Sequence, residues 1–550
     1  MTENNQGDQA DAEAIPAPEG PTEIIDTDYE VGQDNITPKV GPFGLDIHNP
    51  VFLISGATIV LFVVLTIAFQ SSTEPMFTAL RGWLTSTFDW FFLLAGNIFV
   101  LVALGILVSP LGKVRIGGKD AKPDFGYAGW FAMLFAAGMG IGLMFYGVLE
   151  PVYHMALSQP LGIPPLFDES GAIIEENVAI ARSAGMAATI YHWALHPWAI
   201  YAIVALALAI FSYNKGLPLS VRSMFYPIFG ERIWGWTGHI IDILAVFATL
   251  FGLATSLGIG AEQASAGLGF LFGMPDSNFA KVLLIIGITG IALLSVVAGL
   301  DAGVKRLSEI NMVLAAVLLL FVILVGPTLG IITGFFQNLW GYARDIIPLS
   351  NPFGRTDDAF RQGWTSFYWA WWISWSPFVG MFIARVSRGR TVREFITCVL
   401  IIPSLVSVLW MSAFGGAAID QVLTNSESAV REYVIDGYVL ELSLFGMLSE
   451  LPLAQITSFV AIILVIVFFV TSSDSGSLVI DTITAGGKVN APVSQRVFWA
   501  SFEGLVAIAL LLGGGLTALQ AMAVSTGFPF TIILLLACFA VIKGLMDEPR

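Results

Sequence analysis

Charged residues are scarce in this sequence, and cysteine is scarcer still. Only 12% of the 550 residues are charged, whereas 56% are hydrophobic. Soluble domains carry roughly 25% charged residues, so this shortage excludes an ordinary soluble fold and indicates a chain that lies mostly in lipid. The two cysteines, Cys398 and Cys538, both fall in apolar stretches, which argues against a disulfide framework or a thiolate metal site.

Lysine and arginine are nearly absent from the interior of the apolar runs. A voltage sensor or a charged pore would need such residues there, so a channel of either kind is not expected. No nucleophile–base pair typical of an enzyme is visible. Three acids fall near membrane segments, Glu150, Asp242 and Asp474. We interpret them as helix caps or local ion-pair partners, with a proton relay as the alternative.

Long apolar runs are abundant. A run of about 20 apolar residues is long enough to cross a bilayer as a helix. The runs predict an all-α polytopic membrane protein with twelve transmembrane helices. They are expected near residues 50–70, 88–110, 125–156, 179–212, 233–270, 279–299, 309–338, 359–385, 391–416, 440–472, 494–513 and 517–543. Short amphipathic pieces are expected near 301–309 and 424–436.

The distribution of charge predicts the domain boundaries and the orientation. Residues 1–43 hold ten acids and one base, so we expect an acidic disordered tail over 1–45. The membrane domain then covers 46–545, followed by a short C-terminus over 546–550. The tail has the wrong sign to bind nucleic acid. Fifteen basic residues lie in the even-numbered loops and seven in the odd-numbered ones, which predicts a bacterial inner-membrane protein with both termini in the cytoplasm.

A glycine motif interrupts the third predicted helix. Gly138, Gly140 and Gly142 occupy alternate positions after Ala136 and Ala137. Each glycine weakens a helix by about 1 kcal/mol, and unwound backbone in a membrane is tolerated where it lines a cavity. Such breaks offer carbonyl groups to a cation and helix dipoles to a solute. Close helix packing is the alternative interpretation.

Aromatic residues gather in the fourth and eighth predicted helices. The fourth contains Trp193, Trp198 and Tyr201, and Pro197 between them loosens the helix. The segment 367–378 has four tryptophans within seven residues, at positions 369, 371, 372 and 375. Tryptophan faces attract cations, and aromatic cages hold quaternary ammonium groups. The pattern predicts such a cage, with interfacial belts or core packing as the alternative.

Consecutive hydroxyl residues follow an apolar run in the tenth predicted helix. Thr471 and Ser472 come directly after the stretch that contains Phe468. Hydroxyl oxygens together with carbonyls from the broken third helix would form a hard, all-oxygen site that suits Na⁺. Hydrogen bonding back to the helix is the alternative.

These segments together resemble the betaine/carnitine/choline transporter family, and most closely its sodium-coupled glycine betaine members. The resemblance rests on Gly138-Met139-Gly140, on Glu150-Pro151, and on the tryptophan-rich segment followed by 385–391. It implies a leucine-transporter-like fold with two extra helices, then inverted repeats formed by helices 3–7 and 8–12. It also implies a homotrimer in membrane lipid.

The resemblance implies roles for individual residues. The ammonium cage would consist of Trp193, Trp198, Tyr201 and Trp372. Trp371 and Trp375 would lie along the path, Phe367 would form an outer gate, and Gly138, Met139, Gly140 and Gly142 would contact the solute. One sodium site would use Ala136, Met139, Phe468, Thr471 and Ser472. A second would use Ala137, Thr249 and Phe378, but Leu253 stands where two-sodium carriers have a second threonine.

The expected function is Na⁺-coupled import of a zwitterionic compatible solute by alternating access. Glycine betaine, ectoine and proline-like solutes are the candidates. Gly142 stands where choline carriers of the family have an aspartate, which disfavours a net-cationic solute. An Na⁺-independent exchanger, or a proton-coupled carrier of carnitine or choline, is the alternative. The sequence also ends at Arg550, so the long basic extension of osmoregulated members is not expected to act here.

Overall fold

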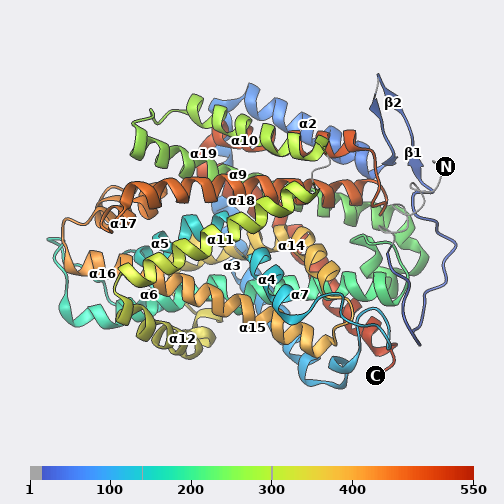
Figure 1. The fold of residues 1–550 in the computed structure, drawn as a ribbon, viewed down its shortest axis with the longest axis horizontal. Coiled ribbons are helices and arrows are strands. Elements are labelled where there is room, and N and C mark those ends of the chain that lie inside the picture. The colour runs from blue at the N-terminus through green and yellow to red at the C-terminus, as the bar shows by residue number, and fades with distance from the viewer. Residues whose placement is uncertain (1–14, 42, 139, 299–300) are drawn as a thin grey trace.

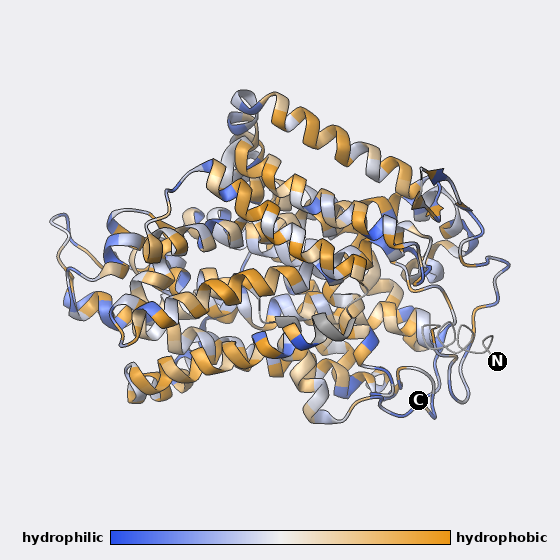
Figure 2. Ribbon diagram, turned by 45° about the horizontal axis from the view of Figure 1, so that its top comes forward, coloured by the Kyte–Doolittle hydropathy of each residue, from blue (hydrophilic) through white to orange (hydrophobic). Residues whose placement is uncertain are grey.

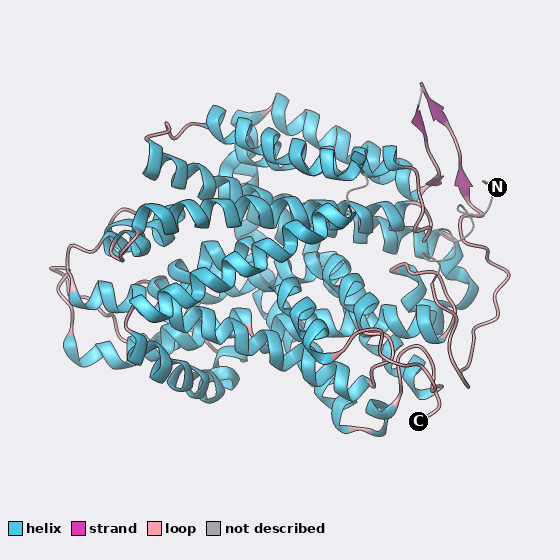
Figure 3. Cartoon of the chain, in the orientation of Figure 1, coloured by secondary structure: helices cyan, strands magenta, loops and turns pink. Residues whose placement is uncertain are grey.

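A computed structural model describes residues 15–550 except 42, 139, 299 and 300. Within this part of the chain the fold is helical almost throughout (Figure 3), which confirms the predicted all-α class. Strands occur only as two-residue pairs near the N-terminus. β1 (Asn35–Ile36) pairs with β4 (Ile47–His48), and β2 (Lys39–Val40) pairs with β3 (Phe43–Gly44). Their side chains contact the ends of later helices, since Asn35 donates to the Ala485 carbonyl at 2.9 Å and the His48 ring lies 5.1 Å from that of His239.

The helices of the membrane domain follow one another with short connections. They are α2 (Val51–Ala68), α3 (Gln70–Val108), α4 (Tyr127–Gly138), α5 (Ile141–Ala156), α6 (Val178–Trp193), α7 (Leu195–Ala209), α9 (Trp236–Phe272), α10 (Asn278–Ala298), α11 (Asp301–Val325), α12 (Thr328–Ser350), α14 (Ser366–Val386), α15 (Val392–Trp410), α16 (Gly416–Thr424), α17 (Ser443–Ser449), α18 (Ala454–Thr484) and α19 (Val493–Met546).

Twelve membrane crossings can be traced through these helices. Within the described residues, nine helical stretches are long and apolar enough to cross a membrane. One of the nine, the 54-residue α19, accounts for two crossings, because its backbone leaves the helical region at Gly514 and Gly515. The interrupted pair α4–α5 and the tryptophan-rich α14 supply two more. The count therefore agrees with the sequence prediction.

Inner and outer helices differ in how much of their surface is covered. In α9 the most apolar window is 83% buried, whereas in α10 it is 28% buried. Helix α14 packs against α7, α9 and α19, and α18 packs against α9. Hydrophobic residues predominate along the peripheral helices (Figure 2). The pattern fits a bundle whose centre is protein and whose surface contacts lipid.

Two predicted helices are divided differently in the structure. The prediction of a single seventh helix over 309–338 is wrong. The chain forms two helices there, because α11 ends before Gly326-Pro327 and α12 begins after them. Proline lacks the N–H that would continue the helix. The short piece expected at 301–309 is instead the start of α11. The tenth, expected over 440–472, is α17 followed by α18, which continues to Thr484.

The N-terminal tail also departs from the prediction. Disorder was expected over 1–45, yet residues 15–45 lie along the ends of several helices; residues 1–14 are outside the described part. The Tyr29 ring stacks on Trp234 with 4.1 Å between ring centroids. Glu19 pairs with Arg388, and its N–H donates to the Gly117 carbonyl at 2.9 Å. The strands β1 and β2 and the C-terminus lie at the same end of the molecule (Figure 1). The tail is thus held by specific contacts, which composition alone cannot reveal.

Candidate functional site

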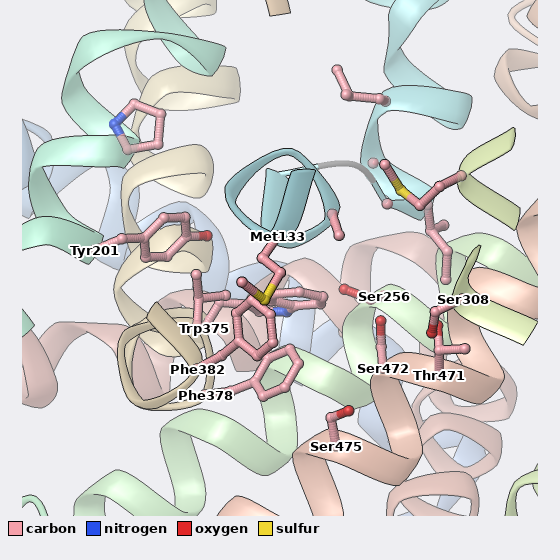
Figure 4. Close-up of a pocket in the computed structure, with 18 of the residues that line it drawn as sticks. Met133, Tyr201, Ser256, Ser308, Trp375, Phe378, Phe382, Thr471, Ser472 and Ser475 are labelled. Atoms are coloured by element: carbon pink, nitrogen blue, oxygen red, sulfur yellow. The ribbon is translucent and has the colours of Figure 1, made fainter. Parts of the chain in front are cut away.

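A central cavity of about 840 Å³ lies between α4, α5, α7, α9, α11, α14 and α18. Its wall brings together most of the residues singled out in the sequence. Aromatic side chains including Tyr201, Trp375 and Phe378 form one side (Figure 4), and hydroxyl side chains form the other. The predicted residues that line it are Ala136, Gly140, Gly142, Trp193, Trp198, Tyr201, Trp371, Trp372, Trp375, Phe378, Thr471 and Ser472.

The aromatic residues form walls at right angles to one another. The Trp372 ring meets Trp193 at 4.9 Å between centroids and an interplanar angle of 75°. It meets Tyr201 at 6.3 Å and 76°, and Trp198 meets Tyr201 at 5.5 Å and 78°. Trp371 stacks parallel to Trp372 at 4.9 Å. These faces and edges come from α6, α7 and α14, so segments far apart in sequence meet here, as an aromatic cage requires.

The first cage helix is broken at Ala194 rather than at the proline expected to loosen it. Ala194 has φ −109° and ψ −117°, which separates α6 from α7. Pro197 lies in the first turn of α7, where its missing N–H removes no helical hydrogen bond. The break places Trp193 and Trp198 in different helices, both facing the cavity.

Gly142 has a steric role that the sequence did not reveal. A Cβ atom at this position would lie 2.5 Å from the Trp193 ring and 3.2 Å from the Trp371 ring. Only a hydrogen fits there without moving a cage residue. Gly140 has extended backbone and is the N-cap residue of α5, and it has no side chain that could accept from the first N–H groups of the helix. The first turn of α5 therefore presents free N–H groups beside the cavity.

A buried carboxylate holds the cage from behind. Glu150 is fully buried and accepts hydrogen bonds from Trp193 Nε1 at 2.7 Å and Tyr368 Oη at 2.6 Å. Its other oxygen accepts from His154 Nε2 at 3.1 Å and from His192 Nδ1. The two remaining imidazole nitrogens contact hydroxyl groups. Four donors suit an ionised carboxylate, which the sequence interpretation as a cap or pair partner had missed.

Among the described residues, Glu150, His154 and His192 form a group with the spacing of metal ligands. Their ligand atoms, on Glu150, His154 and His192, lie within 4.8 Å of one another. Each atom is already used in the hydrogen bonds given above, so the group is explained without an ion. His192 contributes once more, because its main-chain carbonyl accepts from Trp372 Nε1 at 2.9 Å. The network thus orients Trp193 by a side chain and Trp372 by the backbone.

An aromatic layer closes the cavity at the end remote from the chain termini. Phe367 stacks on Trp371 at 5.3 Å, is 1% exposed and does not line the cavity. Tyr146 contacts Tyr368 at 5.4 Å, and Trp364 contacts Tyr153 at 4.7 Å. These side chains separate the cage from the loops after α5 and before α14. The position of Phe367 fits the predicted gate, while the tyrosines were not anticipated.

The cavity extends toward the end that carries the termini. Phe125, at the start of α4, lines it and is 41% exposed, whereas Trp372 is 7% exposed. Phe382, near the end of α14, and Glu309, near the start of α11, also line this part. The structure is therefore open at the tail side and closed at the opposite side.

The first predicted sodium site is brought together in part. Ala136, Thr471 and Ser472 line the same cavity. Thr471 Oγ1 donates to the carbonyls of Val467 and Phe468, both at 3.1 Å. The two bonds share the single hydroxyl proton, so the lone pairs of the Thr471 oxygen remain able to bind a cation. Met139 is outside the described residues, and Gly138 is described only as the last residue of α4.

The second predicted sodium site is more dispersed. Phe378 lines the cavity, but Thr249 does not; it is buried, and its hydroxyl donates to Ala245 O at 2.7 Å. The side chain of Ala137 is outside the described residues. Leu253 is 1% exposed and packs where a Cβ on Gly476 would collide with it. The apolar Leu253 side chain thus packs between α9 and α18, where it offers no oxygen ligand to a cation.

Four further hydroxyl residues line the cavity without having been predicted, namely Ser256, Ser308, Ser407 and Ser475. Ser256 projects from α9 and Ser475 from α18, near Ser472 (Figure 4). Ser475 lies one turn beyond Thr471 on α18, so helical spacing already carried this signal. The sequence around Ser256 carried no such signal, because the position of this side chain depends on how α9 packs.

The chain matches the family model described as BCCT, betaine/carnitine/choline family transporter, over residues 50–550. It is 64% identical to the glycine betaine/proline/choline transporter of Vibrio parahaemolyticus, covering 100% of this chain and 98% of that protein. It is 55% identical to glycine betaine transporter 1 of the same organism, over 96% of this chain and 98% of the relative. Identity to the glycine betaine transporter OpuD of Bacillus subtilis is 42%, over 87% and 91% of the two chains. The chain is a multi-pass membrane transporter that belongs to the betaine/carnitine/choline transporter family.

Proposed function

We propose that this transporter imports a zwitterionic quaternary-ammonium solute, such as glycine betaine, together with Na⁺. The observation that carries the solute class is the right-angled arrangement of Trp193, Tyr201 and Trp372 around one cavity wall. A positive ammonium group without N–H donors gains most from π-faces, and a desolvated cation–π contact contributes about 2 kcal/mol.

The opposite charge of the solute also finds a partner at this cavity. Gly140 and Gly142 line it at the N-terminus of α5, where free N–H groups and the helix dipole favour an anion. A carboxylate placed there needs no basic side chain. The cage and the helix end together suit a solute with both charges, of the betaine, ectoine or proline type.

Sodium coupling is supported by the hydroxyl groups on the other wall. Thr471 and Ser472 lie across the cavity from the aromatic side (Figure 4), and Ala136 lies at the end of the broken helix α4. A cation bound between α4 and α18 would hold the broken helix against the bundle and favour the form that accepts solute. Alternating access between the open tail side and the closed aromatic side completes the cycle.

Orientation and assembly belong to the same proposal. The basic loops lie on the side of the tail, so the positive-inside rule puts both termini and the open end of the cavity in the cytoplasm. The structure then corresponds to an inward-open state. A homotrimer is proposed from the family resemblance.

Uptake into proteoliposomes tests the function. We expect labelled glycine betaine to accumulate when an inward Na⁺ gradient is applied, and not with K⁺ in its place. The control is Thr397→Ala, a hydroxyl outside the cavity that donates within its own helix. It should keep the coupling, whereas Ser472→Ala should weaken it. Equal uptake in Na⁺ and K⁺ would favour an exchanger instead. Unlabelled choline serves as the competing solute, because one relative is a glycine betaine/proline/choline transporter.

A further inference from the structure

Glu503, in the first half of α19, is a buried acid that plays no part in the proposed transport site. It is fully buried in the described structure. Its Oε2 lies 3.0 Å from Ser473 Oγ on α18. Its Oε1 is buried and has no hydrogen-bond partner among the described residues. Among the described residues, the Ser473 hydroxyl is therefore the hydrogen-bond partner of the Glu503 carboxyl group.

Three other acids of the membrane helices have surroundings that suit a negative charge. Glu150 accepts four hydrogen bonds. Asp242 is paired with Arg222 at 2.5 Å and also accepts from the Arg222 main-chain N–H. Asp474 is paired with Arg496 at 2.9 Å. Glu503 has neither a cation nor a set of donors, so burial favours its neutral form.

None of the described basic residues of α2, α3, α9, α10, α18 or α19 pairs with Glu503. Helix α10 touches α19 at Gly504, where a Cβ would lie 2.5 Å from Thr289 Oγ1, and that hydroxyl has no partner among the described residues. The one basic residue of α10, Lys281, is paired elsewhere. On α18, Asp481 accepts from Gln495. Arg496 lies seven residues before Glu503, about 10 Å along the helix, and is already paired.

The partner of Glu503 is next to the proposed sodium ligands. Ser473 follows Thr471 and Ser472 directly, and it faces α19 while those two line the cavity. The contact between Ser473 and Glu503 therefore fixes the rotation of α18 at the level of the cation-binding hydroxyls. A protonated acid can donate to or accept from the serine. A carboxylate in the same place would draw water or a cation and disturb the contact between α18 and α19.

We propose that Glu503 is a proton-binding site, and that the proton it holds keeps α18 in the position in which Thr471 and Ser472 bind the coupling cation. Glu503 acts as a positioning residue, because it touches neither the solute nor the cavity. Its loss of a proton at alkaline pH weakens cation binding. This second half of the proposal rests on the proposed sodium coupling, whereas the protonation itself does not.

Infrared spectroscopy tests the protonation directly. The spectrum of the reconstituted wild-type protein should contain the C=O stretch of a buried carboxylic acid, and this band should be missing in Glu503→Gln. A wild-type spectrum without a band that depends on Glu503 overturns the proposal. The measurement needs no transport, so it stands even if sodium coupling fails.

The pH profile of the half-saturating Na⁺ concentration tests the positioning role. In the wild type this concentration should rise about fivefold toward alkaline pH, the equivalent of one lost hydrogen bond. Glutamine mimics the neutral acid, so Glu503→Gln should bind Na⁺ normally near neutral pH and lose the dependence. Ser473→Ala should bind Na⁺ weakly at every pH.

The matched control is Asp481→Asn on α18, which should keep the wild-type profile. A Glu503→Gln profile identical to that of the wild type would overturn the positioning role, and so would a profile that Asp481→Asn abolishes. Uptake that ignores Na⁺ in the wild type would overturn the proposed function, while the infrared band would still decide the protonation claim.

Discussion

Removal of the Glu150 carboxylate should disable the cage without touching the solute. In Glu150→Ala, Trp193 Nε1, Tyr368 Oη and two imidazole N–H groups lose their acceptor in a site that is fully buried. The tyrosine and the histidines can form other hydrogen bonds, but an indole N–H can only donate. An unsatisfied buried donor costs about 1–3 kcal/mol.

The indole of Trp193 will turn to find an acceptor, and the cage then loses one of its walls. If about 2 kcal/mol acts on the bound state, glycine betaine binding weakens roughly 30-fold. Glu150→Gln keeps one carbonyl acceptor for Trp193 and Tyr368, but it loses the charge, and an NH2 group replaces the oxygen that contacts the two imidazoles. Its binding should weaken about fivefold, the equivalent of about 1 kcal/mol.

The assay is betaine titration of purified protein, followed by intrinsic tryptophan fluorescence. Glu262→Gln serves as the control, since this acid pairs with Lys281 and does not line the cavity. Thermal unfolding of each variant separates loss of affinity from loss of fold. Wild-type affinity in a folded Glu150→Ala protein would refute the reasoning. A Glu150→Gln protein as weak as Glu150→Ala would show that an acceptor for Trp193 alone does not hold the cage, and that the charge and the imidazole contacts are needed.

Three further variants test single contacts of the site. Gly142→Ala should weaken betaine binding at least tenfold, because its Cβ would lie 2.5 Å from the Trp193 ring; unchanged binding would show that the cage yields easily. Trp372→Leu should abolish the fluorescence response to betaine, with Trp340→Leu on the exposed face of α12 as the control; a preserved affinity would remove Trp372 from the cage. Wild-type uptake should show a Hill slope for Na⁺ near one. A slope near two would contradict the interpretation of Leu253 as a residue that blocks a second site.

The sequence prediction of the aromatic residues rests on a compositional signal. Tryptophans concentrated in two helices are rare, and all the predicted tryptophans and Tyr201 do line the cavity. The glycine break was also readable, since glycines at alternate positions destabilise a helix whatever surrounds it. Its steric role at Gly142 was not, because the distance to Trp193 depends on how two helices approach each other.

Contacts between distant segments explain what the sequence could not supply. Glu150 accepts from residues 43 and 218 positions later in the chain, and no spacing rule predicts such a network. The docked tail was missed for the same reason, because its composition is that of a disordered segment although Tyr29 stacks on Trp234. The division at Gly326-Pro327 was in principle visible, but the apolar run on both sides concealed it.

A structure determined with Na⁺ and glycine betaine would test the central claim most directly. The account predicts density for the trimethylammonium group between Trp193, Tyr201 and Trp372, with the carboxylate at the N-terminus of α5. Solute density elsewhere in the cavity, for example beside Glu309 and away from the three rings, would contradict it.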